Sequence, residues 1–221
     1  MTKFQELFPL IFLINLDKRP DRLEKSLQEL SKIKLTEIIR MPGQIYDKSP
    51  YPFINGSIGC MLSHRLCLEE ALRQKKNVFI FEDDIQFIGH NNLSEIIEET
   101  CEELEKTKFD VFYLGANLLK PAQQVSKRLA KLTSAKSTVA YATSYNFIEK
   151  LLSYFPTNEF REPIDATYDN KVVPNNNCYI SIPMCVVQRN DYSDIEGQNV
   201  KYTEYLENRY WSNLVRKVFN E

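Results

Sequence analysis

The stretch Val78-Phe79-Ile80-Phe81-Glu82-Asp83-Asp84 ends an apolar run in three consecutive carboxylates. The length and flanks of the run are typical of a buried strand. In open α/β sheets, ligands bind at the carboxyl ends of the strands, so the triplet marks the edge where we expect the functional site. Strand alternation predicts that Glu82 and Asp84 point to one side and Asp83 to the other.

Strand-like and helix-like segments alternate on both sides of this stretch. We expect strands at 10–16, 37–41, 78–81, 109–114, 138–143 and 179–188, the last interrupted by Pro183. We expect helices at 20–34, 57–74, about 92–106, 144–155 and 203–218. This order predicts βαβ units and a largely parallel sheet. The sequence contains neither an internal repeat nor a linker, so the prediction is one α/β domain over residues 1–221.

Composition narrows the classes of protein to consider. The 221 residues include 28 Lys and Arg against 30 Asp and Glu, which argues against a nucleic-acid binder. The five cysteines are an odd number without a CxxC pair, which indicates reduced thiols in a cytosolic protein. The sequence shows no signal-peptide pattern and no run near the ~18 apolar residues of a membrane span. We therefore expect a cytoplasmic protein.

Charge is unevenly distributed along the chain. Residues 77–105 contain nine acids and no Lys or Arg, whereas residues 111–148 contain five basic residues and no acid. Two interpretations stay open. The segments form two solvated faces, or the basic segment forms a positive rim beside an acidic, cation-loaded site that suits a diphosphate-bearing substrate.

The triplet itself suggests a cation. Three neighbouring carboxylates repel one another, and burial increases that cost, so a cation or hydrogen-bond donors should offset it. Hard oxygen ligands of this type favour Mg²⁺ or Mn²⁺. The alternative is a charged strand end that lies in water.

Two other segments point to an anionic ligand. Residues 14–22 leave the first strand with cations, and Arg19 and Arg22 near a helix start oppose the helix dipole, which makes a bound anion attractive. The alternative is that both arginines are surface charges. Residues 56–64 begin a helix with small residues, which exposes backbone N–H groups to an anion or a ribose.

Taken in order, these three segments resemble glycosyltransferase family 25, the lipopolysaccharide-type and procollagen-type galactosyltransferases. The matching residues are Asn15, Leu16, Arg19, Pro20, Asp21 and Arg22, then Gly56, Ile58, Gly59, Cys60, Leu62, Ser63 and His64, then Glu82, Asp83 and Asp84. Weaker matches at 109–115, 140–152, 163–165 and 183–195 extend the family-like core to about residues 10–196. Residues 200–221 are then expected to form a C-terminal helix.

The resemblance implies a GT-A fold, that is, a Rossmann-like mixed sheet with flanking helices. It also implies a UDP-sugar donor (UDP-galactose or UDP-glucose), a divalent cation and inversion at the anomeric carbon. A cation held by Asp84, with Glu82 or Asp83 alongside, would stabilise the leaving diphosphate. By resemblance, one of the earlier carboxylates of the triplet orients the ribose or the donor sugar instead.

An inverting transfer needs a base that takes the proton of the acceptor hydroxyl. Asp165 is the first candidate, because it follows Pro163 at a helix-opening turn and matches a family position. Its alternative role is a simple helix cap. Asp194 is the second candidate, and it could instead hold the metal or the donor phosphate from a C-terminal loop.

Further residues belong to the implied donor site. His64 matches a donor-site position, with a satisfied core histidine as the alternative, and Asn117 could touch donor or acceptor. The predicted donor-binding set is Asn15, Leu16, Arg19, Arg22, Gly59, Ser63, His64, Asp83, Asn117 and Gln188. Two departures from the family matter. Ser57 stands where the second motif usually has Glu, and no His follows His90. Gln188 or Asp194 would then complete the cation's ligands, or the activity would depend less on a metal than the family resemblance implies.

The sequence therefore predicts a bacterial- or viral-type glycosyltransferase. It would transfer a hexose to a glycan, lipid-linked, lipopolysaccharide-like or protein acceptor, with at most peripheral membrane association through the C-terminal helix. A nucleotidyltransferase is less compatible, because residues 10–25 contain no Gly for a phosphate loop. A nucleotide-sugar binding module without turnover is the other alternative.

Overall fold

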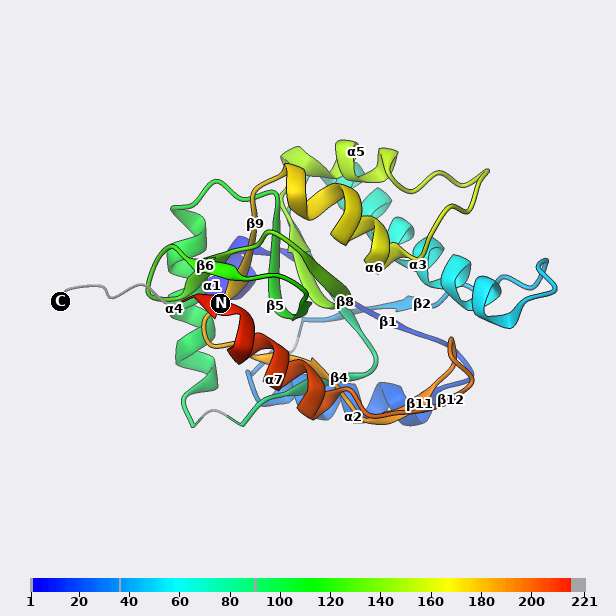
Figure 1. The fold of residues 1–221 in the computed structure, drawn as a ribbon, viewed down its shortest axis with the longest axis horizontal. Helices are drawn as coiled ribbons and strands as arrows, with labels where there is room; N and C mark the ends of the chain where they lie inside the picture. Colours follow the sequence, from blue (N-terminus) through cyan, green and yellow to red (C-terminus); the bar gives the residue numbers. More distant parts are fainter. Residues whose placement is uncertain (1, 36, 90, 216–221) are drawn as a thin grey trace.

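The computed structural model describes residues 2–35, 37–89 and 91–215. A mixed sheet lies at the centre and helices cover both of its faces (Figure 1). Within the described residues the sheet has nine strands, in the order β13-β6-β7-β9-β5-β8-β3-β1-β2. In chain order these are β1 (Leu10–Asn15), β2 (Ile39–Pro42), β3 (Val78–Glu82), β5 (Val111–Leu118), β6 (Ala122–Gln124), β7 (Leu129–Lys131), β8 (Ala135–Thr143), β9 (Cys178–Ser181) and β13 (Leu214–Val215).

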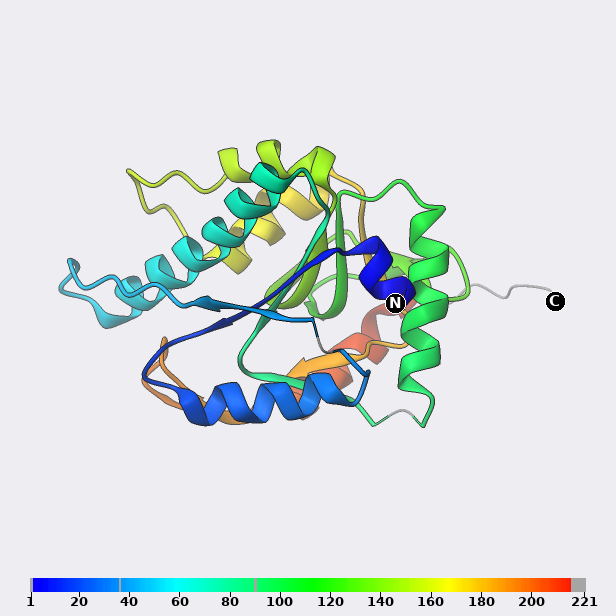
Figure 2. The ribbon, with the colours of Figure 1, turned by 180° about the vertical axis from the view of Figure 1, so that it is seen from behind.

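Helices cover the two faces of the sheet in separate groups. One group is α3 (Pro52–Gln74), α5 (Tyr145–Ser153) and α6 (Ile164–Thr167), which continues as η1 (Tyr168–Val172) and η2 (Val173–Asn175). The other group is α1 (Lys3–Leu7), α2 (Pro20–Ser31) and α4 (Leu93–Glu105), and Figure 2 shows α1 beside α4. The C-terminal α7 (Thr203–Asn213) packs against β5 and β10 (Val186–Gln188).

The sheet is mixed rather than largely parallel. β1 runs parallel to both β2 and β3, whereas β8 lies antiparallel to both β3 and β5. β9 returns to the parallel direction beside β5. The predicted α/β class with a mixed sheet and flanking helices is confirmed. The extent of the domain over residues 1–221 stays a prediction.

Alternating side chains of the inner strands build two hydrophobic cores. Phe12 and Ile80 belong to the core beneath α3 and α5, whereas Leu13 and Phe81 belong to the core beneath α1, α2 and α4. Since side chains in a strand alternate between faces, a strand covered on both sides must be apolar throughout. This is why the runs at 10–14 and 78–81 were recognisable in the sequence.

The predicted strand at 179–188 is two strands in different sheets. β9 ends at Ser181, and a cis peptide bond joins Ile182 to Pro183. β10 then pairs antiparallel with β4 (Ile85–Phe87) in a separate two-stranded sheet. Proline lacks the N–H that a ladder requires, so the main sheet cannot continue through Pro183.

The last predicted helix is shorter than expected. α7 ends at Asn213, and Leu214 and Val215 pair with β6 instead. The remainder of the predicted helix, from residue 216, lies outside the described residues. Among the helices that the structure describes, each is too short or too polar to cross a bilayer.

An irregularity in β8 brings one side chain to the site. The pairing of β5 with β8 steps from Gly115 opposite Ala140 to Asn117 opposite Lys136, so three residues of β8 oppose one of β5. Ser137 in this bulge has a φ of 84°, in the left-handed region that favours glycine. Bulges of this kind re-aim side chains next to functional sites. Here the bulge turns the Thr138 hydroxyl toward Glu82.

Gly115 permits a close contact between β5 and β10, and we predict that an alanine there destabilises the fold. A methyl group at this position would lie 1.8 Å from the carbonyl oxygen of Val186, which is part of the backbone and cannot turn away. Gly115→Ala should lower the free energy of unfolding by about 3 kcal/mol, measured by urea denaturation.

Gly89→Ala is the matched control, because nothing lies within 4 Å of the added methyl group. Its stability should stay within about 0.5 kcal/mol of the parent protein. Equal stabilities for the two variants would contradict the close approach of β10 to Gly115.

Candidate active site

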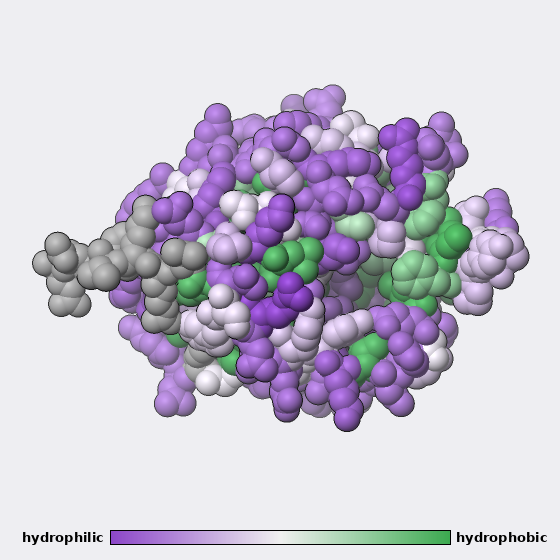
Figure 3. Space-filling view, viewed as in Figure 1, coloured by the Kyte–Doolittle hydropathy of each residue, from purple (hydrophilic) through white to green (hydrophobic). Residues whose placement is uncertain are grey.

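A cavity of about 770 Å³ opens at the carboxyl ends of β1 and β3. Its walls come from the chain after β1, the first turns of α3, the β3–β4 turn, the β8 bulge, the start of α6 and the hairpin of β11 (Asp191–Ser193) and β12 (Gln198–Val200). Figure 3 shows this face hollowed between the upper helices and the hairpin, with hydrophobic side chains at the outer edge. The predicted edge of the sheet is therefore a cleft large enough for a nucleotide-sized ligand.

Glu82 is the last residue of β3 and is fixed by two donors. His64 Nε2 donates to Glu82 Oε1 over 3.2 Å, and Thr138 Oγ1 donates to the same oxygen over 2.6 Å. Burial alone would raise the pKa of this carboxyl, but these hydrogen bonds hold it below its ordinary value. Glu82 is therefore ionised and held in one position.

Asp83 is buried and is held by side chains from the end of β1 and from α2. Asn15 Nδ2 donates to Asp83 Oδ2 over 2.6 Å, and Arg22 Nε lies 3.1 Å from Oδ1. The hydroxyl of Ser26 donates to the Asp83 carbonyl over 2.7 Å, which ties α2 to the turn. Burial is the main cause that raises the pKa of Asp83 above its usual value.

Asp84 has one paired oxygen and one without a partner. Arg22 Nη2 lies 2.9 Å from Asp84 Oδ2, whereas Oδ1 is buried and accepts no hydrogen bond from the described residues. Burial raises the pKa of Asp84 to about 6. A buried carboxylate oxygen without a partner is costly, so this atom is the natural point of attachment for a ligand.

The predicted alternation of the triplet is wrong. β3 ends at Glu82, and Asp83 and Asp84 form a turn, so both contact the same Arg22 guanidinium. Burial alone would lower the pKa of Arg22, but Asp84 and Asp83 raise it above its usual value. The strand alternation therefore stops at Glu82, two residues before the predicted alternation ended.

The two predicted anion-binding arginines are held by carboxylates. Arg22 is buried between Asp83 and Asp84, and Arg19 pairs with Asp21 at 3.0 Å and with Asp194. Lys18 also lies 3.0 Å from Asp194. Although partial burial opposes ionisation, these cations hold the pKa of Asp194 below its usual value. Asp194 is thus a salt-bridged residue of the cavity wall, in the turn between β11 and β12. This hairpin lies beside α2 (Figure 1).

We predict that Arg22→Met destabilises the protein by about 3 kcal/mol, because it leaves two buried carboxylates without their shared cation. The loss should shrink as the pH falls toward 5, since protonation of Asp83 and Asp84 removes the uncompensated charge. Urea denaturation at several pH values measures both effects.

Arg73→Met is the control for Arg22→Met, because its partner Glu70 lies on the same exposed helix surface. Its loss should leave the unfolding midpoint unchanged. An Arg22→Met variant as stable as this control at pH 8 would contradict the role given to Arg22.

Asp165 lies in the wall of the cavity, in the first turn of α6. Its Oδ1 accepts a hydrogen bond from the Ala166 N–H over 2.8 Å, while Pro163 is the residue in the capping position. Burial raises the pKa of Asp165, and nearby Lys136 partly opposes this. A half-buried carboxylate with a raised pKa has the properties of a general base.

Two small residues of α3, Gly59 and Ser63, position the loop at residues 43–46. Ser63 Oγ donates to the Gly59 carbonyl over 2.7 Å and accepts from the Gln44 N–H over 2.8 Å. A methyl group on Gly59 would lie 2.4 Å from the Gln44 carbonyl oxygen. Gly59 is therefore needed for close approach of the 43–46 loop, which itself lines the cavity.

The structure brings most of the predicted site together. Gly59 and Arg19 are outside the lining of the cavity. Asn117 Oδ1 is buried without a hydrogen-bond partner among the described residues, and Gln188 Nε2 lies 3.5 Å from Asp84 Oδ2. The predicted residues that line the cavity are Asn15, Leu16, Arg22, Ser63, His64, Glu82, Asp83, Asp84, Asn117, Asp165, Gln188 and Asp194.

Two lining residues outside the sequence-based site hold the carboxylate triplet in place. Thr138 reaches Glu82 through the β8 bulge, which no sequence pattern announces. Arg189 donates to the carbonyls of Asp83 and Ile85, at 3.0 and 3.2 Å, and so ties β10 to the carboxylate turn. Arg189 had a signal in the sequence, as a cation directly after Gln188, whereas Thr138 had none. Lys136, from the basic segment, lies near Asp165.

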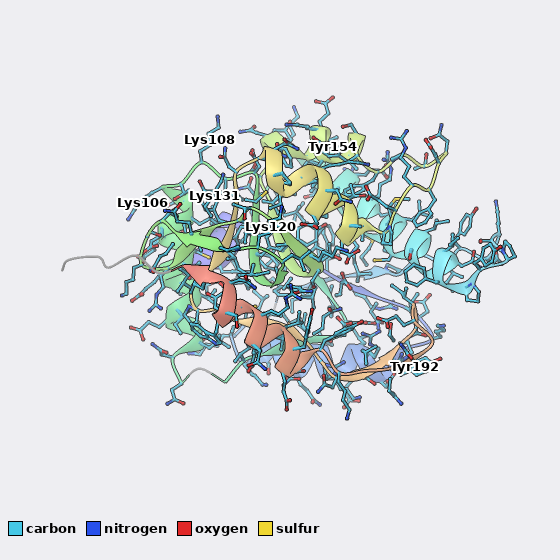
Figure 4. All side chains as sticks on the ribbon, in the orientation of Figure 1. Lys106, Lys108, Lys120, Lys131, Tyr154 and Tyr192 are labelled. Atoms are coloured by element: carbon cyan, nitrogen blue, oxygen red, sulfur yellow. The ribbon has the colours of Figure 1, made fainter. Side chains whose placement is uncertain are left out.

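The basic segment does not form a continuous positive rim. Lys127 and Arg128 pair with Glu99 on α4, at 3.0 and 2.7 Å, and Lys131 donates to Asn177. Figure 4 shows Lys131 on the opposite side of the molecule from Tyr192, which lines the cavity. Among the five basic residues of that segment, only Lys136 lines the cavity.

The cavity residues fit a hard divalent cation. The unpartnered Asp84 Oδ1 and the ionised Glu82 supply oxygen ligands of the type that Mg²⁺ and Mn²⁺ prefer. A cation would also favour the ionised form of Asp84, which burial disfavours by raising the pKa of this carboxyl.

Comparison with known proteins gives a family match over most of the described chain. A sequence model for the family described as "Glycosyltransferase family 25 (LPS biosynthesis protein)" matches residues 36–168. The Bos taurus protein "Probable inactive glycosyltransferase 25 family member 3" is 30% identical over 185 residues, covering 72% of this chain and 31% of that protein. The Mus musculus "Procollagen galactosyltransferase 2" is 26% identical over 186 residues, covering 72% and 29%.

A viral relative has a similar match. The "Procollagen lysyl hydroxylase and glycosyltransferase" of Acanthamoeba polyphaga mimivirus is 24% identical over 190 residues, covering 67% of this chain and 21% of that protein. The chain spans about a third of the length of the first curated relatives it matches. The resemblance seen in the sequence is therefore confirmed at the level of the family.

Proposed function

The chain belongs to glycosyltransferase family 25, and from that membership we propose that it transfers a hexose from a UDP-sugar to an acceptor hydroxyl. The observation that carries this proposal is Asp84, which lines a large cavity and whose buried Oδ1 has no hydrogen-bond partner among the described residues. Transfer of a sugar from a nucleoside diphosphate builds negative charge on the leaving diphosphate. A site that holds a divalent cation at this point matches that requirement.

The proposed cation ligands are Asp84 and Glu82, with Gln188 beside them. A bound Mn²⁺ or Mg²⁺ would supply Lewis-acid stabilisation of the diphosphate. The side chains around the two ligands hold them in place. Arg22 orients Asp84, and His64 and Thr138 fix Glu82. Lys18 and Lys136 line the same cavity and complement a polyanionic donor.

Asp165 is the proposed base. In an inverting transfer, its carboxylate takes the proton of the acceptor hydroxyl as the oxygen attacks the anomeric carbon, while the bond to the diphosphate breaks. Its raised pKa improves its basicity, and Lys136 keeps it ionised near neutral pH. Asp194, salt-bridged to Arg19 and Lys18, is less suited to proton transfer and is proposed to hold the hairpin over the donor.

The acceptor is proposed by class only. The family description names lipopolysaccharide biosynthesis, and the mouse relative is named for procollagen. A glycan, lipid-linked or protein hydroxyl at the apolar outer edge of the cavity, near the exposed Phe53, fits both. The cytoplasmic location inferred from the cysteines stays a prediction.

Binding without turnover is the second candidate function. It is favoured by the names of three relatives, which call the Bos taurus, Homo sapiens and Mus musculus family members 3 inactive or probably inactive. Such a protein would hold a nucleotide sugar in the same cavity without releasing UDP.

One experiment separates the two functions. The full chain is incubated with UDP-galactose, UDP-glucose and other UDP-hexoses with Mn²⁺, and UDP release is measured beside donor binding by calorimetry. Transferase function predicts UDP release with at least one donor, through slow hydrolysis when no acceptor is present. Donor binding with no UDP release, even with added glycan or collagen-type acceptors, would support the binding module.

A further inference from the structure

Cys60, His64 and Glu82 form a three-residue cluster in the wall of the cavity. Cys60 and His64 are four residues apart on α3, so they lie on the same side of that helix. Glu82 faces them from the end of β3. One ligand atom from each residue, a sulfur, a ring nitrogen and a carboxylate oxygen, lies within 4.8 Å of the other two.

Two of these atoms already have the spacing of metal ligands. His64 Nε2 and Glu82 Oε1 are 3.2 Å apart. Two ligands at ~2.0–2.1 Å from a tetrahedral Zn²⁺ are about 3.3 Å apart. A metal would therefore take the place of the ring proton between them, and the Cys60 sulfur lies within 4.8 Å of both atoms.

Two neighbouring hydroxyl groups form hydrogen bonds with the proposed ligands His64 and Glu82. His64 Nδ1 lies 3.1 Å from the Tyr141 hydroxyl, and Thr138 donates to Glu82. A metal-bound histidine usually engages its second ring nitrogen in a hydrogen bond, which fixes the tautomer and the ring plane. Tyr141 can accept that hydrogen bond from the protonated Nδ1.

The electrostatic surroundings favour a dication. Burial raises the pKa of the Cys60 thiol, and the nearby carboxylates of Glu82, Asp165 and Asp84 raise it further. A coordinating metal deprotonates a thiol outright, because its own charge dominates the local field. The mixture of sulfur, nitrogen and oxygen suits Zn²⁺, whereas Mg²⁺ and Mn²⁺ prefer oxygen alone.

We propose that Cys60, His64 and Glu82 bind Zn²⁺ at a site separate from the oxygen-ligand site at Asp84. Three protein ligands leave the fourth position open toward the cavity, where water or a ligand oxygen can bind. Because Glu82 belongs to both ligand sets, Zn²⁺ at this site withdraws it from the other cation and inhibits transfer. The inhibition rests on the proposed function, but the binding does not.

Titration of the full chain with Co²⁺ tests the binding without any activity measurement. The expected result is one Co²⁺ per chain, with a thiolate-to-cobalt absorption band that Zn²⁺ abolishes by displacement. Cys60→Ser should lose the band and keep its circular dichroism spectrum. Cys67→Ala, which removes a buried thiol from the same helix, should keep the band.

Two further variants separate this site from its neighbours. Tyr141→Phe should weaken Zn²⁺ binding about 10- to 100-fold and leave the cobalt band in place, as loss of an outer partner does. Asp84→Asn should keep Zn²⁺ binding even where it abolishes donor binding, which distinguishes this proposal from the proposed function. A wild-type protein without the band, a band that survives in Cys60→Ser, or loss of Zn²⁺ binding in Asp84→Asn would overturn the proposal.

Discussion

Asp84→Asn is expected to lower the rate of sugar transfer about a thousandfold, since the charge stabilisation that a cation gives the leaving group is worth several kcal/mol. The amide has the shape of the carboxylate but is a poor ligand for a hard cation. Arg22 keeps its contact with Asp83, so the turn should stay intact. Initial rates of UDP release with the preferred donor measure the effect.

The same variant should be more stable than the parent protein in metal-free buffer at pH 7. Burial raises the pKa of Asp84 to about 6 in the folded protein, above the ordinary value of 3.8. The ionised form is therefore disfavoured by folding, and the associated loss of stability develops as the pH rises from about 4 to about 6. Thermal unfolding should show a higher midpoint for Asp84→Asn at pH 7, with the difference vanishing near pH 4.

Glu102→Gln on the exposed surface of α4 is the control for Asp84→Asn. It removes one negative charge outside the cavity and should change neither the transfer rate nor the unfolding midpoint. Full transfer activity in Asp84→Asn would remove Asp84 from the cation site.

Asp165→Asn is expected to lower the turnover number about 10²- to 10⁴-fold, the usual contribution of a general base. Donor affinity should be nearly unchanged, because the proposed role of Asp165 concerns the acceptor proton. The parent enzyme should lose activity as the pH falls through the raised pKa of Asp165, and this acidic limb should disappear in the variant. Turnover and donor affinity are measured across the pH range.

Asp169→Asn is the matched control, one helical turn further along the chain. Its carboxylate accepts a hydrogen bond from Ser134 and is outside the lining of the cavity. Turnover close to that of the parent is expected. If Asp165→Asn behaves like this control, the base must be sought elsewhere in the cavity.

Long, buried elements were predictable from the sequence for a simple physical reason. β1 and β3 are covered on both faces, so their apolar runs stand out, and α2 shows a helical period of leucines. The three-residue strands β4, β10, β11 and β12 have no such pattern. Their existence depends on pairing partners that the fold brings together, as β4 and β10 are from positions about 100 residues apart.

The sequence predicted where the candidate site lies, but not how its side chains contact one another. The carboxyl end of β3 was the correct edge, and most predicted residues line one cavity there. What the sequence could not show is that Asp83 and Asp84 leave the strand and share Arg22. The β8 bulge with Ser137 at positive φ, which delivers Thr138 to Glu82, was equally hidden.

A crystal structure with UDP and Mn²⁺ bound tests the account most directly. The anomalous signal of manganese locates the cation independently of the protein density. We predict a manganese peak in contact with Asp84 Oδ1 and with the diphosphate of UDP inside the cavity. Manganese and UDP bound together at any other place, with Asp84 still held by Arg22 alone, would contradict the central claim.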